Sequence, residues 1–119
     1  MEPINIADKL ARISDHWNPR IVAELNGQHV KLVKFQGEFV WHDHKDEDEM
    51  FLVIRGSFRM DYRDRSVTVS EGEFIVVPRG VEHRPVAERE VDVMLFEPAA
   101  MKHTGDVASP LTVREFQRL

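Results

Sequence analysis

A chain of 119 residues is long enough to bury one hydrophobic core, and we expect a single domain over residues 1–119. The absence of cysteine excludes disulfide bonds, thiolate zinc sites, iron–sulfur clusters and a thiol nucleophile. The net charge of −5, from 16 basic and 21 acidic residues, leaves no Lys- and Arg-rich patch, so we expect no nucleic-acid partner.

The sequence also lacks segments that target a membrane. Residues 1–5 contain no basic stretch followed by an apolar one, as a signal peptide would. Apolar runs reach only about five residues, far short of a membrane span. We therefore expect a cytoplasmic protein with no membrane partner.

The N-terminal segment, residues 1–19, is predicted to contain one short helix. Asn5 is a suitable N-cap, and apolar residues recur at helical spacing from Ile6 to Ile13. Pro19 follows a polar stretch, and the residue before a proline disfavours helix.

From about residue 20 to residue 98 the pattern is typical of β-structure. Asn26-Gly27 is a strong hairpin signal between two apolar runs. About eight to ten short strands with frequent turn signals predict a sandwich or barrel. The expected strands cover residues 21–25, 30–35, 39–44, 49–55, 57–62, 67–69, 74–77 and 90–97.

The C-terminal tail, residues 99–119, is predicted to be irregular as far as residue 110. Thr112 and Glu115 match a capping box, which predicts one or two helical turns over Val113 to Leu119.

Four residues are candidate metal ligands. His42 and His44 stand two apart, so on a strand both imidazoles point to the same face. Glu49 begins the next apolar run, and His83 follows a Pro-x-Gly turn further along the chain. Three imidazoles and a carboxylate suit one divalent transition metal, and the ligand set does not choose among Fe, Mn, Ni, Zn, Co and Cu.

These residues carry a resemblance to the cupins. The first cupin motif is similar to Gly37, His42-Asp43-His44, Glu49 and Gly56, and the second to Gly72, Pro78-Arg79-Gly80 and His83. There are two departures: four residues rather than five separate Gly37 from His42, and Ala87 occupies the position of the second motif's Asn.

The resemblance implies an all-β fold, the double-stranded β-helix or jelly-roll barrel, over about residues 20–98, flanked by short N- and C-terminal helical segments. It implies metal ligation by His42, His44, Glu49 and His83, and a homodimer. Phe39 and Trp41, on the strand face opposite the histidines, would suit the dimer interface.

Several residues near the motifs have competing interpretations. Asp43, Asp46, Glu47 and Asp48 fit a solvated loop better than a second metal or general-base site. Glu47 is the rival of Glu49 as ligand, but only Glu49 leaves six residues before Gly56. The remaining histidines have no partner at ligand spacing and are interpreted as surface or turn residues; they are His16, His29 and His103.

A small-molecule ligand is expected inside the barrel, as small β-barrels can enclose one. The candidate pocket residues are Phe51, Met60, Arg79, Met94 and Phe96. For the four apolar ones the alternative is ordinary core packing. Arg79 either meets an anionic substrate or lies on the surface.

Three functions are compatible with the pattern. The first is a metal-dependent enzyme acting on a small organic molecule, with the metal as Lewis acid in an isomerase, epimerase or decarboxylase, or as redox centre in a dioxygenase. The second is a non-catalytic module that binds or senses a small metabolite. The third is a scaffold whose barrel serves for dimerisation.

Overall fold

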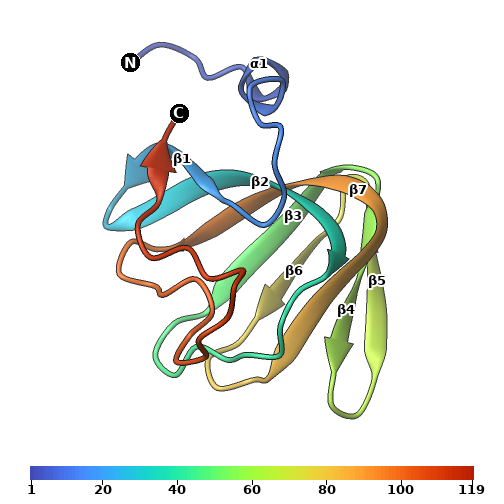
Figure 1. The fold of residues 1–119 in the computed structure, drawn as a ribbon. Helices are drawn as coiled ribbons and strands as arrows, with labels where there is room; N and C mark the ends of the chain where they lie inside the picture. The colour runs from blue at the N-terminus through green and yellow to red at the C-terminus, as the bar shows by residue number, and fades with distance from the viewer.

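The computed structural model describes residues 1–119 as one β-barrel with a short helix packed outside it (Figure 1). The elements are α1 (Ile6–Leu10), β1 (Arg20–Leu25), β2 (Gln28–Glu38), β3 (Glu49–Arg55), β4 (Ser57–Tyr62), β5 (Ser66–Ser70), β6 (Phe74–Val77), β7 (His83–Pro98) and β8 (Gln117–Arg118). None of its helices has the length and apolarity needed to cross a membrane.

The long strand β7 joins the two halves of the barrel. Its first residues pair with β4, its last residues pair with β3, and nearly its whole length pairs antiparallel with β2. A register shift in β2 between Phe35 and Gly37 lets that strand bend along with β7. The resulting strand order is β5-β4-β7-β2-β1-β8, with β3 placed between β7 and β6.

Two local predictions are confirmed near the N-terminus. The Asn5 side chain accepts a hydrogen bond from the Asp8 N–H at 2.9 Å and caps α1. The helix ends at Leu10, short of the expected Ile13, although both side chains are buried. Asn26 and Gly27 have φ angles of 50° and 76°, as a tight hairpin turn between β1 and β2 requires.

The segment predicted as a strand over residues 39–44 is mostly irregular. β2 ends at Glu38, and His42 alone forms a bridge, exchanging backbone hydrogen bonds of 3.1 and 2.9 Å with His83. The chain is thus held beside the start of β7 by this bridge and by the Phe39 N–H, which donates to the Pro85 carbonyl at 3.0 Å, without a continuous ladder.

The predicted C-terminal helix is wrong. Residues 117–118 form β8, which pairs parallel with β1, and the Leu119 N–H donates to the Ile21 carbonyl at 2.9 Å. The Thr112 hydroxyl does not cap a helix; it accepts from the Ser109 N–H at 3.1 Å. The open edge of β1 supplies unpaired backbone groups, and the tail satisfies them as a strand.

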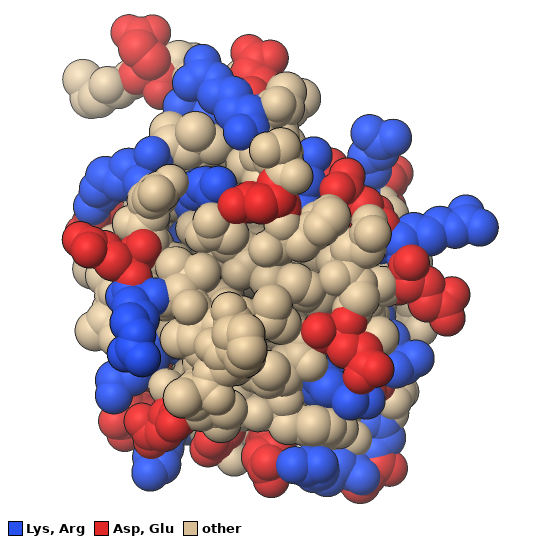
Figure 2. All heavy atoms as spheres, viewed as in Figure 1, with Lys and Arg blue, Asp and Glu red and all other residues tan.

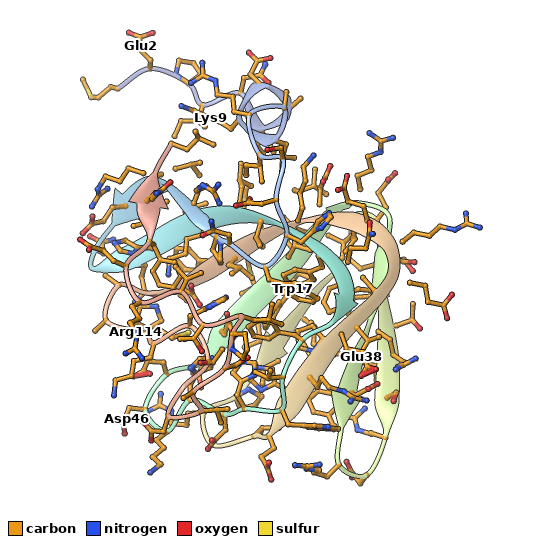
Figure 3. The ribbon with its side chains drawn as sticks, in the orientation of Figure 1. Glu2, Lys9, Trp17, Glu38, Asp46 and Arg114 are labelled. Carbon is orange, nitrogen blue, oxygen red and sulfur yellow. The ribbon has the colours of Figure 1, made fainter.

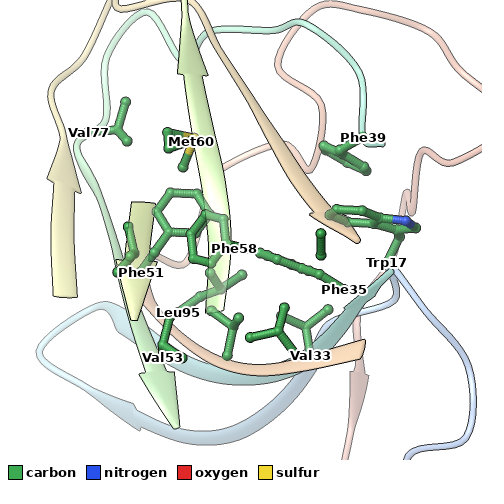
Figure 4. Packing of buried hydrophobic residues seen from close by; sticks show 14 residues of the cluster. Trp17, Val33, Phe35, Phe39, Phe51, Val53, Phe58, Met60, Val77 and Leu95 are labelled. Carbon is green, nitrogen blue, oxygen red and sulfur yellow. The ribbon is translucent and has the colours of Figure 1, made fainter. Parts of the chain in front are cut away.

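An aromatic core fills the interior of the barrel (Figure 4). Trp17 stacks on Phe35 and Phe39 at ring distances of 4.4 and 4.7 Å, and Phe35 meets Phe58 edge-on. Phe39 is buried here, so its expected place in a dimer interface is wrong. Trp41 is half-buried and faces outward, where the guanidinium of Arg63 lies 4.0 Å from its ring.

Candidate metal centre

The structure brings the four predicted ligands together. His42, His44, Glu49 and His83 are all buried, and one ligand atom from each lies within 4.8 Å of the others. Glu49 is the first residue of β3 and His83 the first of β7, while both other histidines come from the irregular segment after β2. The cluster therefore lies where two strands begin at one end of the barrel.

Backbone carbonyls set the orientation of two of the imidazoles. His42 Nδ1 donates to the Val40 carbonyl at 2.9 Å, and His83 Nδ1 donates to the Val81 carbonyl at 2.8 Å. A carbonyl only accepts, so the proton of each neutral ring is on Nδ1. Each Nε2 then keeps a free lone pair, as a metal ligand must.

The remaining polar atoms of the cluster are buried without partners. His44 Nε2, His83 Nε2 and Glu49 Oε1 make no hydrogen bond, although Glu49 Oε1 lies 3.3 Å from the first and 3.7 Å from the second. Buried polar groups are rarely left unsatisfied, because each costs about 1–3 kcal/mol. Converging lone pairs of this kind fit a shared cation.

The protonation states also suit a metal. Burial, together with the nearby His83, lowers the pKa of His42 to about 3, so its imidazole is neutral near pH 7. Burial alone would raise the pKa of Glu49, but the contacts from His44 and His83 outweigh it and hold that pKa well below its usual range. Neutral imidazole and ionised carboxylate are the forms that bind metals.

A buried ion pair lies next to Glu49. Lys31 Nζ lies 2.7 Å from Glu97 Oε1, and the two side chains are 0% and 4% exposed. Burial and the negative charge of Glu49 raise the pKa of Glu97 well above its usual range. The Lys31 ammonium also lies 3.5 Å from the centre of the Phe116 ring. The C-terminal segment thus reaches the surroundings of the metal centre.

Sequence reasoning missed this pair, although a signal was present. Val91, Val93 and Leu95 are buried on the inner face of β7, and Glu97 continues the same alternation. The period of two along the strand therefore places that carboxylate inside the barrel.

A small cavity adjoins the cluster, and a larger one shares only His103 with it. A cavity of about 20 Å³, lined by His42, Glu49, Phe51 and His103 among others, has room for roughly one water molecule. A larger one of about 620 Å³ lies under the C-terminal segment, and His103 borders it too. Figure 2 shows charged side chains around the margin of the barrel's open face and a largely uncharged centre.

Only part of the predicted pocket lies beside the ligands. Phe51 lines the small cavity, and Met60 is fully buried in the adjoining core. Met94 packs in a separate outer cluster with Leu10, and Phe96 shares that outer face of β7. Leu95 points inward in their place, because alternate residues of a strand face opposite sides. Neither Met94 nor Phe96 lines the cavity.

The side chains of Arg79 and of the acidic loop do not join the ligand cluster. The Arg79 side chain is 63% exposed and lies 3.5 Å from Asp48, which also accepts a hydrogen bond from the Arg79 N–H. Glu47 does not join the cluster of candidate ligands, whereas Glu49 does. Lys45, in the same loop, pairs with Asp106 of the C-terminal segment at 3.3 Å.

The other predicted surface histidines differ from one another. His16 pairs with Glu90 at 2.7 Å and is half-buried. His29 is 8% exposed and lies 3.5 Å from Glu24. His103 borders both cavities, and the sequence offered no spacing that would have placed it there.

The sequence of residues 28–106 matches the cupin-2 family, described as the cupin domain. The chain belongs to the cupin family. The two motifs, the barrel and the clustered ligands agree with this assignment.

Several proteins with solved structures are similar over most of the chain. A cupin-2 domain-containing protein from Shewanella frigidimarina NCIMB 400 is 47% identical, with a TM-score of 0.79, over 80% of this chain and 93% of that one. Protein NMB1881 from Neisseria meningitidis is 36% identical, with a TM-score of 0.76, over 82% of this chain and 100% of that one. Hydroquinone 1,2-dioxygenase PnpCD shares the fold, with a TM-score of 0.74 at 18% identity, over 84% of this chain and 33% of that one.

Among curated proteins, the uncharacterized protein YdbB of Bacillus subtilis (strain 168) is 36% identical over 64 residues. The match covers 53% of this chain and 57% of YdbB, so the chain spans little more than half the length of that relative.

Proposed function

We propose that the chain binds one divalent transition metal through His42, His44, Glu49 and His83, and acts through it on a small organic molecule. The observation that carries the proposal is the convergence of three buried, unpartnered ligand atoms on one point. An imidazole-rich set suits Fe, Mn, Ni, Zn, Co or Cu.

A bound metal would supply Lewis-acid chemistry, as in an isomerase, epimerase or decarboxylase, or redox chemistry, as in a dioxygenase. The chain's own residues hold the ligands and limit the entry of water. The carbonyls of Val40 and Val81 fix two imidazoles, and the aromatic wall around Trp17 borders the small cavity. PnpCD, whose structure was determined in complex with Fe3+, shares only the fold with this chain.

The experiment that tests metal binding is elemental analysis of the protein purified without a histidine tag. One metal per chain is expected, together with its loss in His83→Ala. Trace metal that does not change in the variant would contradict the proposal. Catalysis is tested with sugars, keto acids and aromatic diols in the presence of Fe(II), Mn(II), Ni(II) or Zn(II), and turnover should disappear on chelation.

A second candidate is a non-catalytic module that binds or senses a small metabolite. The observation that favours it is the lining of the small cavity, where His103 is the one side chain besides the candidate ligands that could act as acid or base. A compound that raises the melting temperature of the metal-loaded protein without being consumed would support this candidate over the enzyme.

We further propose a homodimer formed through the outer face of β3, β6 and β7. Phe74 and Val76 are 62% and 48% exposed, and the strand register places them opposite Leu52 and Met50. Met50 pairs in turn with Phe96, so the apolar side chains are contiguous across three strands. Light scattering should give a dimer at micromolar concentration and a monomer for Phe74→Glu. A monomeric wild-type protein would contradict this interface.

A further inference from the structure

His103 stands between the candidate metal centre and the C-terminal segment. Its ring borders the small cavity together with His42 and Glu49, and it borders the large cavity with residues of the C-terminal segment. No cupin motif includes this position, because His103 lies well beyond the last motif residue, His83. Its place follows from how residues 99–116 fold back over the barrel (Figure 1).

The backbone fixes the tautomer of His103. The Val113 N–H donates a hydrogen bond to His103 Nδ1 at 2.8 Å. An amide N–H only donates, so Nδ1 must accept with its lone pair, and the proton of the neutral ring is on Nε2. Burial lowers the pKa of His103 to about 4, which keeps the ring neutral near pH 7.

Packing holds the ring in this position. Its centre is 5.0 Å from that of Phe39 and 5.7 Å from that of Phe116, which it meets edge-on. Phe39 in turn contacts the ring of His42 at 5.3 Å. The Nε2–H has no hydrogen-bond partner within the chain, although the ring is largely enclosed. A fixed donor without a partner, on a ring that borders the cavity of the candidate metal ligands, is suited to a bound molecule.

The charge of the centre limits what that molecule can be. A divalent cation with three neutral imidazoles and the Glu49 carboxylate leaves one net positive charge at the ligands. The residues that border the small cavity with His103 add no exposed cationic side chain. A small anion with oxygen donors, such as a carboxylate or an enolate, matches both this charge and a neutral N–H donor.

We propose that His103 Nε2–H donates a hydrogen bond to an oxygen of a small anionic ligand bound at the metal centre. This inference rests on the proposed function, because it requires the metal. His103 thereby selects oxygen-bearing anions, and the C-terminal segment takes part in binding by fixing the tautomer through Val113. The large cavity provides the space for the rest of the molecule.

The test uses the full chain loaded with Co(II), whose visible spectrum reports ligand exchange, and formate as the probe. We expect formate to bind about tenfold more weakly to His103→Phe, which keeps the aromatic packing and removes the donor. His103→Gln, whose amide N–H can replace Nε2–H, should recover most of the affinity. Cobalt affinity should be unchanged in both variants, and His16→Phe serves as the control. His103→Phe also leaves the Val113 N–H without its acceptor, so its melting temperature should fall somewhat while cobalt binding persists.

A second measurement checks the tautomer. Nitrogen-15 spectra of the metal-free and zinc-loaded wild-type protein should show an unprotonated Nδ1 and a protonated Nε2 for His103 near pH 7. A role in packing alone would not require this pattern.

The outcomes separate the two proposals. If the protein does not bind Co(II), the metal centre fails and this inference fails with it. If Co(II) binds but formate does not, or formate binds His103→Phe as it binds the wild type, the inference is overturned and the metal centre stands. Protonation of Nδ1 in place of Nε2 would overturn it as well.

Discussion

The ligand region, residues 37–83, and the C-terminal segment, residues 99–119, meet at the same site but are specified differently. In the ligand region, short spacings place His42, His44 and Glu49 together, and one bridge to His83 completes the set. The C-terminal segment has no motif and obtains its structure by docking on the barrel, with Phe116 over Lys31 and β8 beside β1. Short spacings in the sequence therefore specify which residues are candidate ligands, whereas the residues around them are brought there by contacts between distant parts of the chain.

Figure 3 shows how closely the two regions approach each other. Arg114, on the C-terminal segment, and Asp46, on the loop between β2 and β3, lie on the same side of the barrel. Lys45 of that loop pairs with Asp106 at 3.3 Å, and Gly105 lies directly against the Asp43 carbonyl. Substitutions in the two regions can therefore show which contacts stabilise the fold and which bind the metal.

The largest expected effect is on the buried Lys31–Glu97 pair, which has Glu49 of one region and Phe116 of the other as neighbours. Lys31→Ala leaves Glu97 buried without its partner, and we expect the free energy of unfolding to fall by about 3–5 kcal/mol. Urea unfolding followed by circular dichroism measures the change. Arg118→Ala, which breaks the exposed pair with Glu24, is the matched control and should have little effect. Equal losses in the two variants would show that the burial of Lys31 does not matter.

Metal removal should have the next largest effect. A metal that binds only the folded state at a free concentration of 100 times Kd adds about 2.7 kcal/mol of stability. We expect chelation to lower the melting temperature of the wild type and to leave His44→Ala unchanged. Differential scanning calorimetry with and without metal measures this. Stabilisation by metal that persists in His44→Ala would place the ion elsewhere.

Gly105→Ala tests the docking of the C-terminal segment. Gly105 has a φ angle of 59°, and a Cβ there would overlap the Asp43 carbonyl. Strain of this kind costs about 1–3 kcal/mol. Gly72→Ala is the control, since its φ angle is also positive but nothing lies within 4 Å of the added Cβ.

Hydrogen exchange should show which part of the chain the strain in Gly105→Ala destabilises. Amide protection should fall in residues 99–119 and persist in β2, β3 and β7, since the barrel core does not include the tail. Loss of protection throughout the barrel would show that the two regions unfold as one unit.

The smallest expected effect is a pH dependence that belongs to His103. Burial lowers its pKa to about 4 in the folded protein, so the unfolded chain binds a proton first as pH falls below about 6.5. Stability should therefore decrease between pH 6.5 and pH 4, by on the order of 1 kcal/mol at pH 6 from this residue. Urea unfolding at several pH values should show a shallower decrease for His103→Gln. Identical slopes would contradict the burial of the ring.

Much of the site could be predicted because its signals are local. Strand alternation and motif spacing identified the four residues that the structure clusters, and favoured Glu49 over Glu47. The Asn5 cap and the Asn26–Gly27 turn depend only on neighbouring backbone atoms. The pocket was predicted less well, since Met94 and Phe96 face outward while Leu95 and Glu97 face inward.

By itself, then, the sequence determined the barrel and its ligand set, because side-chain direction in a strand repeats every two residues and turns are set by their own residues. Only the tertiary structure decided the C-terminal strand β8, the buried Lys31–Glu97 pair and the place of His103. Lys31 and Glu97 lie 66 residues apart in the chain. Contacts across such separations depend on how whole elements pack, which no short pattern encodes.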